Sequence, residues 1–319
     1  MKKFRLKRIV SGFGLLCLCI AGGLYFFYFR APSDFPKGTI VTIKSGETVR
    51  GVAEAFESAH LVRSGLWLTN FVILVGNEAR VTEGDYFFPE TESVYSIAQR
   101  ITHGTYKLAP TKITIPEGSS VADIAAILKS NFPLFNSKEF LSKARDQEGY
   151  LFPDTYYFMA NTPVDDIIKK LRTTFDQKMG SLRITIDTFN RPFDEVVTMA
   201  SILEGEARQY ETRRIVAGIL WKRIEIGMPL QVDATFKYIN GKGSAELTMA
   251  DLKIKSPYNT YVNKGLPPTP ISNPGYDAIK AALNPKSNPY IYFLTGKDGE
   301  MHYAKTLEEH VVNKRKYLS

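Results

Sequence analysis

The chain has 319 residues and a formal net charge of +8, from 41 basic and 33 acidic side chains. Hydrophobic residues make up 44% of it and aromatic residues 12%, a composition that excludes an intrinsically disordered chain. The first eight residues hold five of the basic side chains, so the remainder is only mildly basic. Because it lacks the Lys/Arg stripe that nucleic-acid binding needs, we expect no nucleic-acid partner.

The N-terminus predicts a membrane anchor. Residues 1–8 are basic, residues 9–29 form an apolar run without a charge, and Arg30 ends the run. A helix of that length spans about 30 Å, which matches a bilayer core. The positive-inside rule then places residues 1–8 in the cytoplasm and the rest of the chain across the inner (cell) membrane. A cleaved signal peptide is the alternative, but its apolar region would be shorter and would end in small residues.

Cysteine and histidine usage limits the chemistry. Cys17 and Cys19 both lie within the apolar run, so the exported part contains no disulfide and no reactive thiolate. The four histidines are scattered without the spacing of metal ligands. We therefore expect neither a metal nor a cofactor.

A repeated pattern follows the linker at residues 30–37. Residues 41–62, 84–104 and 113–130 each read as a strand, a turn and an amphipathic helix. Because each copy buries little surface alone, we expect the copies to pack together. The pattern resembles LysM-like modules, which bind glycans containing N-acetylglucosamine, and we assign residues 38–110 to such a subdomain. A small α/β packing domain without ligand explains the pattern equally well.

Residues 111–319 are predicted to form a larger mixed domain, which gives the chain an α+β fold class. The segment 228–243 reads as irregular, and the Pro- and Gly-rich segment 256–275 cannot be helix interior or central strand. A hairpin is expected around residues 297–299, before a basic terminal helix. Helices are predicted over residues 136–147, 162–180, 192–207, 211–227 and 276–285.

Two acids on one of these helices are candidates for chemistry. Glu204 and Glu206 lie near the end of the helix at 192–207, which is apolar on both faces. A carboxyl in such surroundings has a raised pKa and can donate a proton near neutral pH. Helical spacing puts Glu204 on the more apolar face. On spacing alone, however, ion pairs with a nearby arginine explain both acids better, the candidates being Arg208, Arg213 and Arg214.

Polar and aromatic side chains on the loops are candidates for sugar binding. Amide and hydroxyl groups bind sugar hydroxyls, and aromatic faces stack on pyranose rings. Turn formation by Asn and Asp is the alternative, although it does not by itself explain Asn259. The candidates are Gln231, Asp233, Thr235, Tyr258, Asn259, Thr260, Tyr261 and Asn273.

Several motifs together resemble one family. The segments EGYLFPDTYYF, MASILEGEA, GMPLQVDATFKY, SPYNTY and KGLPPTPISNPG are similar, in this order, to the endolytic murein transglycosylase, or YceG-like, family. The family usually has A-S-I-[IV]-E-K-E-T where this chain has Gly205 and Ala207, and L-Q-T-D-P-T where it has Val232 and Ala234. These departures leave both acids and Gln231 in place.

The resemblance implies an activity and a role for each acid. Glu206 would be the catalytic acid, and Glu204, Glu148 and Asp154 would be supporting residues. The implied reaction cleaves the MurNAc–GlcNAc bond of nascent peptidoglycan strands without water. It leaves a 1,6-anhydro end that terminates elongation, which makes the enzyme a lyase. Peptidoglycan synthases are the expected protein partners, and Gln231 and Asn259 would hold the sugar.

Three other functions are compatible with the residues. One is a membrane-anchored glycan-binding protein whose Glu pair is structural, and another is a scaffold for cell-wall synthesis. The third is an ordinary muramidase, which would need two carboxylates set across the bond.

Overall fold

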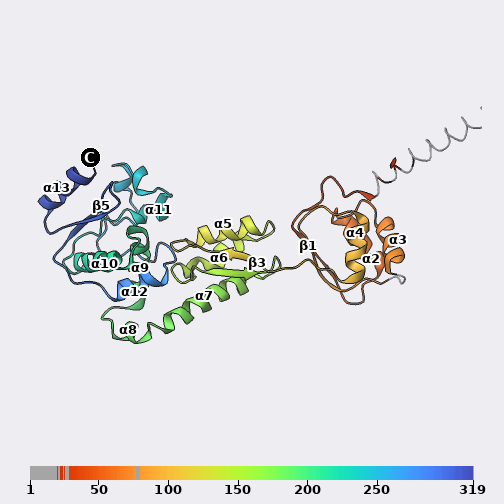
Figure 1. Cartoon of the computed structure of the whole chain (residues 1–319), viewed down its shortest axis with the longest axis horizontal. Coiled ribbons are helices and arrows are strands. Elements are labelled where there is room, and N and C mark those ends of the chain that lie inside the picture. Colours follow the sequence, from red (N-terminus) through yellow and green to blue (C-terminus); the bar gives the residue numbers. More distant parts are fainter. Residues whose placement is uncertain (1–19, 21, 24, 26–28, 77–79, 319) are drawn as a thin grey trace, which may run out of the picture. The chain divides into compact units, whose positions relative to one another are not determined.

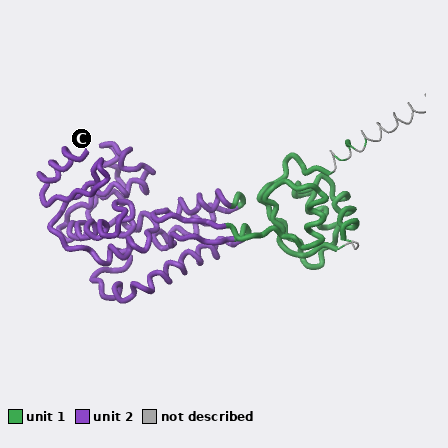
Figure 2. Tube along the Cα trace, viewed as in Figure 1, with its two compact units in different colours: residues 1–111, 132–134, 159–161 green, residues 112–131, 135–158, 162–319 purple. Residues whose placement is uncertain are grey.

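The computed structural model describes residues 20, 22–23, 25, 29–76 and 80–318. The chain divides into two compact units (Figure 2). The first division along the chain falls at Thr111. Unit 1 comprises residues 1–111, 132–134 and 159–161, and unit 2 comprises residues 112–131, 135–158 and 162–319.

The predicted anchor, residues 9–29, lies almost entirely outside the described residues. Among the helices that the structure does describe, none combines the length and the apolar character that crossing a membrane requires. The anchor therefore stays a prediction from the sequence.

Unit 1 combines a two-stranded sheet with helices. Strand β1 (Thr39–Ile43) pairs antiparallel with β2 (Gly84–Phe88), and Thr39 lies opposite Phe88. Phe56, Tyr86 and Phe88 are fully buried between the sheet and the helices, so the core of this unit is built on aromatic side chains. The helices are α2 (Val49–Ser58), α3 (Gly65–Gly76) and α4 (Val94–His103).

The predicted repeat is divided between the two units. Its first two copies form β1–α2 and β2–α4 of unit 1, and their strands pair with each other. The third copy forms β3 (Thr111–Thr114) and α5 (Val121–Asn131), and β3 pairs with β4 (Thr155–Phe158). The expectation that all three copies pack together is therefore wrong. The third strand is paired instead by an aromatic segment in which Tyr156 and Phe158 alternate with exposed residues.

One part of unit 2 places α5, α6 (Ser137–Ala144) and α7 (Val164–Gly180) beside β3 (Figure 1). Helix α7 is long because its apolar residues recur every three or four positions along one face. This buried row consists of Val164, Ile167, Leu171, Phe175 and Met179.

The remaining part of unit 2 is mainly helical and ends in a hairpin (Figure 1). Strand β5 (Tyr292–Thr295) pairs antiparallel with β6 (Met301–Ala304), as the turn at 297–299 predicts, and α13 (Leu307–Tyr317) follows. The other helices are α8 (Arg183–Thr188), α9 (Phe193–Glu206), α10 (Tyr210–Glu225), α11 (Ala234–Asn240) and α12 (Tyr276–Leu283).

Helix α9 forms the centre of this core. Every residue from Val196 to Leu203 is buried, which confirms the prediction of a helix that is apolar on both faces. Helices α10 and α12 pack against it with Leu220, Trp221 and Ile279. The helix ends at Glu206, because Ala207 continues in an extended conformation. Both candidate acids thus lie in the last turn of a rigid, buried helix.

The structure confirms the α+β fold class and the five predicted helices of residues 136–285, as α6, α7, α9, α10 and α12. It corrects the segment 228–243, which was expected to be irregular but contains α11. Helix α11 matters for the site because it places residues 233–238 next to the end of α9.

Candidate active site

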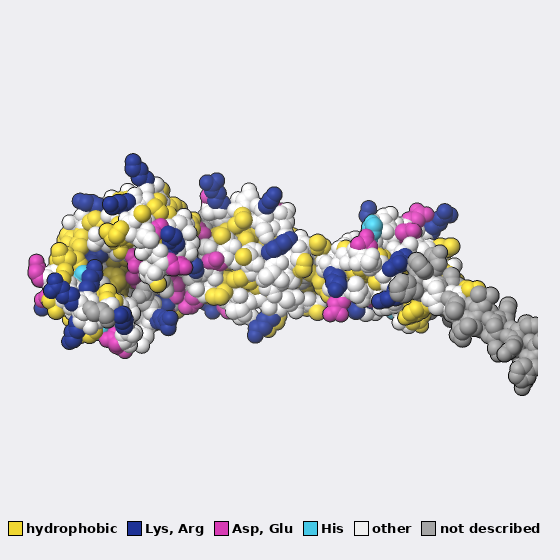
Figure 3. Space-filling view, turned by 90° about the horizontal axis from the view of Figure 1, so that it is seen from above, with side chains coloured by type: hydrophobic (Ala, Val, Ile, Leu, Met, Phe, Trp, Pro, Cys, Tyr) yellow, Lys and Arg dark blue, Asp and Glu magenta, His cyan; other side chains and the backbone are white. Residues whose placement is uncertain are grey.

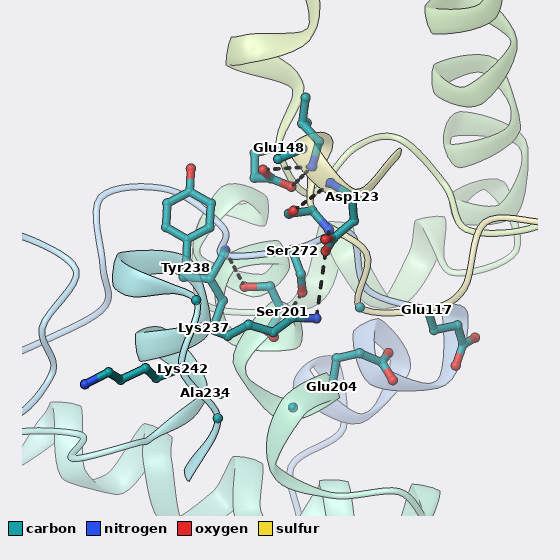
Figure 4. A pocket seen from close by; sticks show the side chains of 18 of the residues that line it. Glu117, Asp123, Glu148, Ser201, Glu204, Ala234, Lys237, Tyr238, Lys242 and Ser272 are labelled. Atoms are coloured by element: carbon teal, nitrogen blue, oxygen red, sulfur yellow. Dashed lines mark hydrogen bonds and ion pairs between the residues drawn. The ribbon is translucent and has the colours of Figure 1, made fainter. Parts of the chain in front are cut away.

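A cavity of about 930 Å³ opens in unit 2 beside the end of α9. Its lining comes from the start of α5, the end of α9, α11 with the turn that follows it, and residues 271–272. Figure 4 shows Glu204 and Glu117 at one end of this cavity, Glu148 at the other, and Ser201 between them. The cavity is therefore bordered by carboxyl groups at both ends.

Glu204 is held in place as an ion-paired carboxylate. It pairs with Arg213 of α10, and both side chains are buried. Its second oxygen accepts a hydrogen bond from the backbone N–H of Gly275 at 2.9 Å. The pKa of Glu204 is raised overall, chiefly by burial and also by the charge of Glu117, although the Gly275 N–H and Arg213 act to lower it. The ion-pair interpretation of the sequence is confirmed for this acid.

Glu206 has a different environment. Its Oε1 accepts a hydrogen bond from the backbone N–H of Ala234 at 3.3 Å, and it forms no ion pair among the described residues. The pKa of Glu206 is raised from 4.5 to about 7, chiefly because burial disfavours the charged carboxylate. The negative charge of Asp233 adds to this, while the Ala234 N–H and Arg223 oppose it. The ion-pair interpretation is wrong for Glu206.

The two chain segments next to Glu206 come very close together. A Cβ atom at Gly205 would lie 2.8 Å from Cβ of Ala234, nearer than side-chain atoms pack. Gly205 and Ala234 are two of the four positions at which the motifs depart from the family pattern. The departures therefore meet in space, and the missing side chain at Gly205 leaves room for the start of α11.

Asp233 is tied to the loop that carries the YNTY motif. Its Oδ1 accepts a hydrogen bond from the hydroxyl of Tyr261 at 2.6 Å, and burial raises the pKa of that hydroxyl. The backbone N–H of Gln231 donates to the carbonyl of Thr260 at 3.0 Å. These bonds fix Asp233, which lines the cavity, at the side of Glu206.

Glu148 and Asn273 form a buried network at the other end of the cavity. Both oxygens of Glu148 lie 3.1 Å from the backbone N–H of Val121, the first residue of α5. The amide of Asn273 donates to Glu148 at 3.1 Å and accepts from the N–H of Leu151 at 2.8 Å. Burial raises the pKa of Glu148 to about 7. Asn273 thus supports the site through Glu148.

Several predicted sugar ligands turn out to support loops. Asn259 is fully buried, and its amide donates to the carbonyls of Leu252 and Ile254. The hydroxyls of Thr235 and Thr260, also buried, bond to the carbonyl of Val232. We revise the role of these three residues from sugar contact to loop support, since their polar groups are already used within the protein.

Other predicted residues lie outside the cavity lining. Gln231 is exposed and takes a left-handed backbone conformation with a φ of +49°. Tyr258 hydrogen-bonds Thr269 at 2.8 Å. Asp154 is exposed at the start of β4, where it pairs with Lys178 at 3.5 Å. The structure thus places Glu204, Glu148 and Asp233 in the cavity lining and Glu206 beside it, bonded to the lining residue Ala234, whereas Asp154 lies outside.

Sequence reasoning missed part of the lining. Asp123 and Lys237 form an ion pair at 3.8 Å in the cavity lining, beside Tyr238 of α11 (Figure 4). The ring of Tyr238 lies tilted against that of Tyr258, with the centroids 4.8 Å apart. Residues 117–123 were assigned only to a repeat, and α11 was not predicted. The acidic turn at Glu117 directly after a strand was the signal that could have pointed to them. The described residues contain no group of His, Cys, Asp or Glu that could hold a metal ion.

Comparison with known proteins gives consistent matches. The model of the YceG-like family matches residues 41–316. An endolytic murein transglycosylase of Bacillus subtilis (strain 168) is 31% identical over 307 residues, which covers 88% of this chain and 84% of that protein. One of Streptococcus pneumoniae serotype 2 is 27% identical over 359 residues, covering 98% of this chain but 65% of that longer protein. The 2.6 Å crystal structure of a putative YceG-like protein from Listeria monocytogenes superposes with a TM-score of 0.58 at 28% identity, covering 86% of this chain and 98% of that one.

Proposed function

Because the chain belongs to the YceG-like family, we propose that it is an endolytic murein transglycosylase and that Glu206 is its catalytic acid and base. One observation carries the assignment of the residue. Glu206 is a carboxyl with a pKa of about 7 and without an ion pair among the described residues; it does not itself line the cavity, but its neighbours Gly205 and Ala234 do. Such a group is present in both protonation states near neutral pH, as acid–base catalysis requires.

The reaction uses this one carboxyl twice. Protonated Glu206 donates its proton to the glycosidic oxygen between MurNAc and GlcNAc, and the bond from that oxygen to C1 of MurNAc breaks. The C6 hydroxyl of the same MurNAc then attacks C1 and gives its proton back to Glu206. The products are a GlcNAc hydroxyl and a 1,6-anhydro end, so no water is consumed and the enzyme is a carbon–oxygen lyase.

Glu204 is less suited to this role than Glu206. The ion pair with Arg213 and the N–H of Gly275 stabilise Glu204 as a carboxylate, so protonating it would break both interactions. Glu206 loses little when it changes protonation state, because its hydrogen bond from Ala234 is long. Glu204 would instead fix the last turn of α9 against α10 and the start of α12.

The substrate would lie in the cavity of unit 2. Asp123, Lys237 and Tyr238 offer charged and hydroxyl groups to sugar hydroxyls and to the amide substituents of the glycan. Asp233 would act on the reaction indirectly, since its charge keeps the pKa of Glu206 raised and Tyr261 fixes its position. Binding energy from such contacts orients the C6 hydroxyl for attack.

Unit 1 and the N-terminus complete the proposal. Unit 1 would be a LysM-like glycan-binding module, supported by its strand–helix pattern and by a concavity of about 690 Å³ between the β1–α2 turn and residues 80–83. Residues 9–29 would anchor the chain in the cell membrane with the N-terminus in the cytoplasm. The catalytic unit would then meet nascent strands near the peptidoglycan synthases that make them.

Product analysis tests the proposal. The full chain, in detergent, is incubated with glycan strands, and the products are sized and weighed by mass spectrometry. We expect fragments of many lengths from the start, each with an end one water lighter than a reducing end. The Glu206→Gln variant should form at least about a hundredfold fewer of them. Asp154→Asn, a matched change of an exposed acid outside the cavity, should cut normally. Reducing ends would identify a muramidase, and binding without cleavage would identify a glycan-binding protein.

A further inference from the structure

Helix α3 of unit 1 exposes an apolar face. Leu66 and Leu74 are each 70% exposed and Ile73 is 48% exposed, while Trp67 is half-buried. These four residues, here called the α3 patch, lie on one side of the helix because positions separated by seven residues share a face. The opposite side packs into the core of unit 1 through Leu68 and its neighbours. A cluster of large apolar side chains on the surface indicates an interaction site.

The α3 patch begins where the apolar run of the N-terminus ends. The ring of Phe29, the last residue of that run, lies 5.6 Å from the ring of Trp67 and 4.9 Å from that of Phe71. Two nitrogen atoms of Arg63, just before α3, bond to the carbonyl of Ala31 at 3.3 Å. The end of the run and the start of α3 are therefore held together within unit 1.

Two exposed basic side chains lie near the start of the same helix. Arg63 precedes α3, and Arg30 follows Phe29. Figure 3 shows hydrophobic side chains at the surface of unit 1, with Lys and Arg but also Asp and Glu side chains near them. Arginine next to apolar residues and a tryptophan is the composition of segments that lie in the headgroup region of a bilayer with anionic lipids.

We propose that the α3 patch inserts into the headgroup region of the membrane, so that unit 1 rests on the bilayer surface. The inference rests on the proposed anchor at residues 9–29, because that anchor brings Phe29 and α3 to the membrane. The occupant of the patch is lipid: the apolar side chains contact the upper acyl chains, and Arg30 and Arg63 contact anionic headgroups. The bilayer thereby fixes the tilt of unit 1, which a single-helix anchor alone would leave free.

Tryptophan fluorescence tests this contact. The full chain is reconstituted into vesicles of phosphatidylethanolamine and phosphatidylglycerol, with or without a lipid brominated near the headgroup end of its acyl chains. The chain has two tryptophans, and Trp221 is buried in the core of unit 2, so subtracting the Trp67→Phe spectrum isolates Trp67. We expect Trp67 emission to shift to the blue in vesicles and to be quenched by the brominated lipid.

Variants separate the patch from the anchor. The double variant Leu66→Gln and Leu74→Gln should float with the vesicles but lose the quenching of Trp67. The matched control Leu134→Gln, an exposed apolar residue of unit 1 outside α3, should keep it. Thermal unfolding checks that the double variant is folded, and the single Leu74→Gln change replaces it if it is not.

Each other outcome overturns a stated part of the inference. A chain that floats with the vesicles but shows unquenched Trp67 refutes the surface contact and leaves the anchor intact. A blue-shifted but unquenched Trp67 means that protein, not lipid, covers the patch, and this also refutes the contact. A chain that fails to float refutes the anchor and the inference with it. None of these readouts depends on glycan cleavage, so they are independent of the proposed activity.

Discussion

Glu148 and Glu206 lie in different regions of unit 2 and have nearly the same pKa. Burial is the chief reason that the pKa of each is raised from 4.5 to about 7. Their hydrogen bonds differ. Glu148 receives the N–H of Val121 on both oxygens and the amide of Asn273, each at 3.1 Å. Among the described residues, Glu206 receives one bond, from Ala234 at 3.3 Å.

The comparison shows that a raised pKa does not by itself identify a catalytic acid. Glu148 joins the start of α5 to the loop at Asn273, so its oxygens already serve the fold. Glu206 has oxygen lone pairs to spare and can give and take a proton without breaking a network. Hydrogen-bond saturation, rather than pKa, separates the structural carboxyl from the one that we propose to be reactive.

Substitution of each acid by glutamine should give the largest difference between them, in the rate of strand cleavage. Glu206→Gln removes the only group in the proposed reaction that transfers protons, and we expect strand cleavage to fall by about 10²- to 10⁴-fold. Glu148→Gln should lower the cleavage rate far less, because it touches no reacting atom in the proposal. Initial rates of anhydro-end formation measure both, with circular dichroism as the folding control. Equal losses, or a larger loss for Glu148, would move the catalytic role to the other end of the cavity.

The free energy of unfolding should show the opposite order, because Glu148→Gln should destabilise unit 2 more than Glu206→Gln does. In Glu148→Gln the amide oxygen can keep the bonds from Val121 and Asn273 at the Oε1 position, but the NH₂ group at the Oε2 position cannot accept from Val121, so we expect unit 2 to lose about 1 kcal/mol of unfolding free energy. Urea unfolding followed by the emission of buried Trp221 reports on this unit. The measurement belongs near pH 5, where both acids are largely protonated in the folded chain and the hydrogen bonds alone differ. Glu206→Gln is the control and should lose little; a loss as large as that of Glu148→Gln would contradict the assignment of a structural network.

The sequence predicted those features of this site that depend on local periodicity. Helix α9, its burial and the position of both acids in its last turn follow from residues at helical spacing. The partners of the acids do not. Asn273 reaches Glu148 from 125 positions away, and no local pattern encodes that contact. Only the structure shows that Glu204, and not Glu206, pairs with an arginine.

Helices without a regular apolar period were also missed. Helix α3 is apolar on nearly every side, which removes the contrast that periodicity needs, and α11 has seven residues. The loop residue Asn259 was assigned to a sugar because its motif is polar and aromatic. Its burial and its bonds to Leu252 and Ile254 depend on the return of the loop, which spacing does not reveal.

The pH dependence of the cleavage rate is the smallest expected effect that distinguishes Glu206 from Glu148. Glu206 must be protonated to start the reaction, so the cleavage rate should decline as the pH rises through about 7, its pKa. The same raised pKa means that its contribution to stability is complete below 4.5 and is lost as the pH rises through about 7. Glu206→Gln should therefore gain stability relative to the natural chain above neutrality while it loses activity.

Two matched aspartate variants identify which acid sets that decline. Asp233→Asn removes a negative charge that raises the pKa of Glu206, so the decline should move to lower pH, while Tyr261 can still donate to the asparagine oxygen. Asp123→Asn removes the charge that raises the pKa of Glu148 and should leave the decline in place. Rate profiles over pH for the three proteins measure the shift. If Asp123→Asn shifts the decline in the cleavage rate and Asp233→Asn does not, the titrating acid is Glu148. The reason is that Asp123 raises the pKa of Glu148, whereas Asp233 raises the pKa of Glu206.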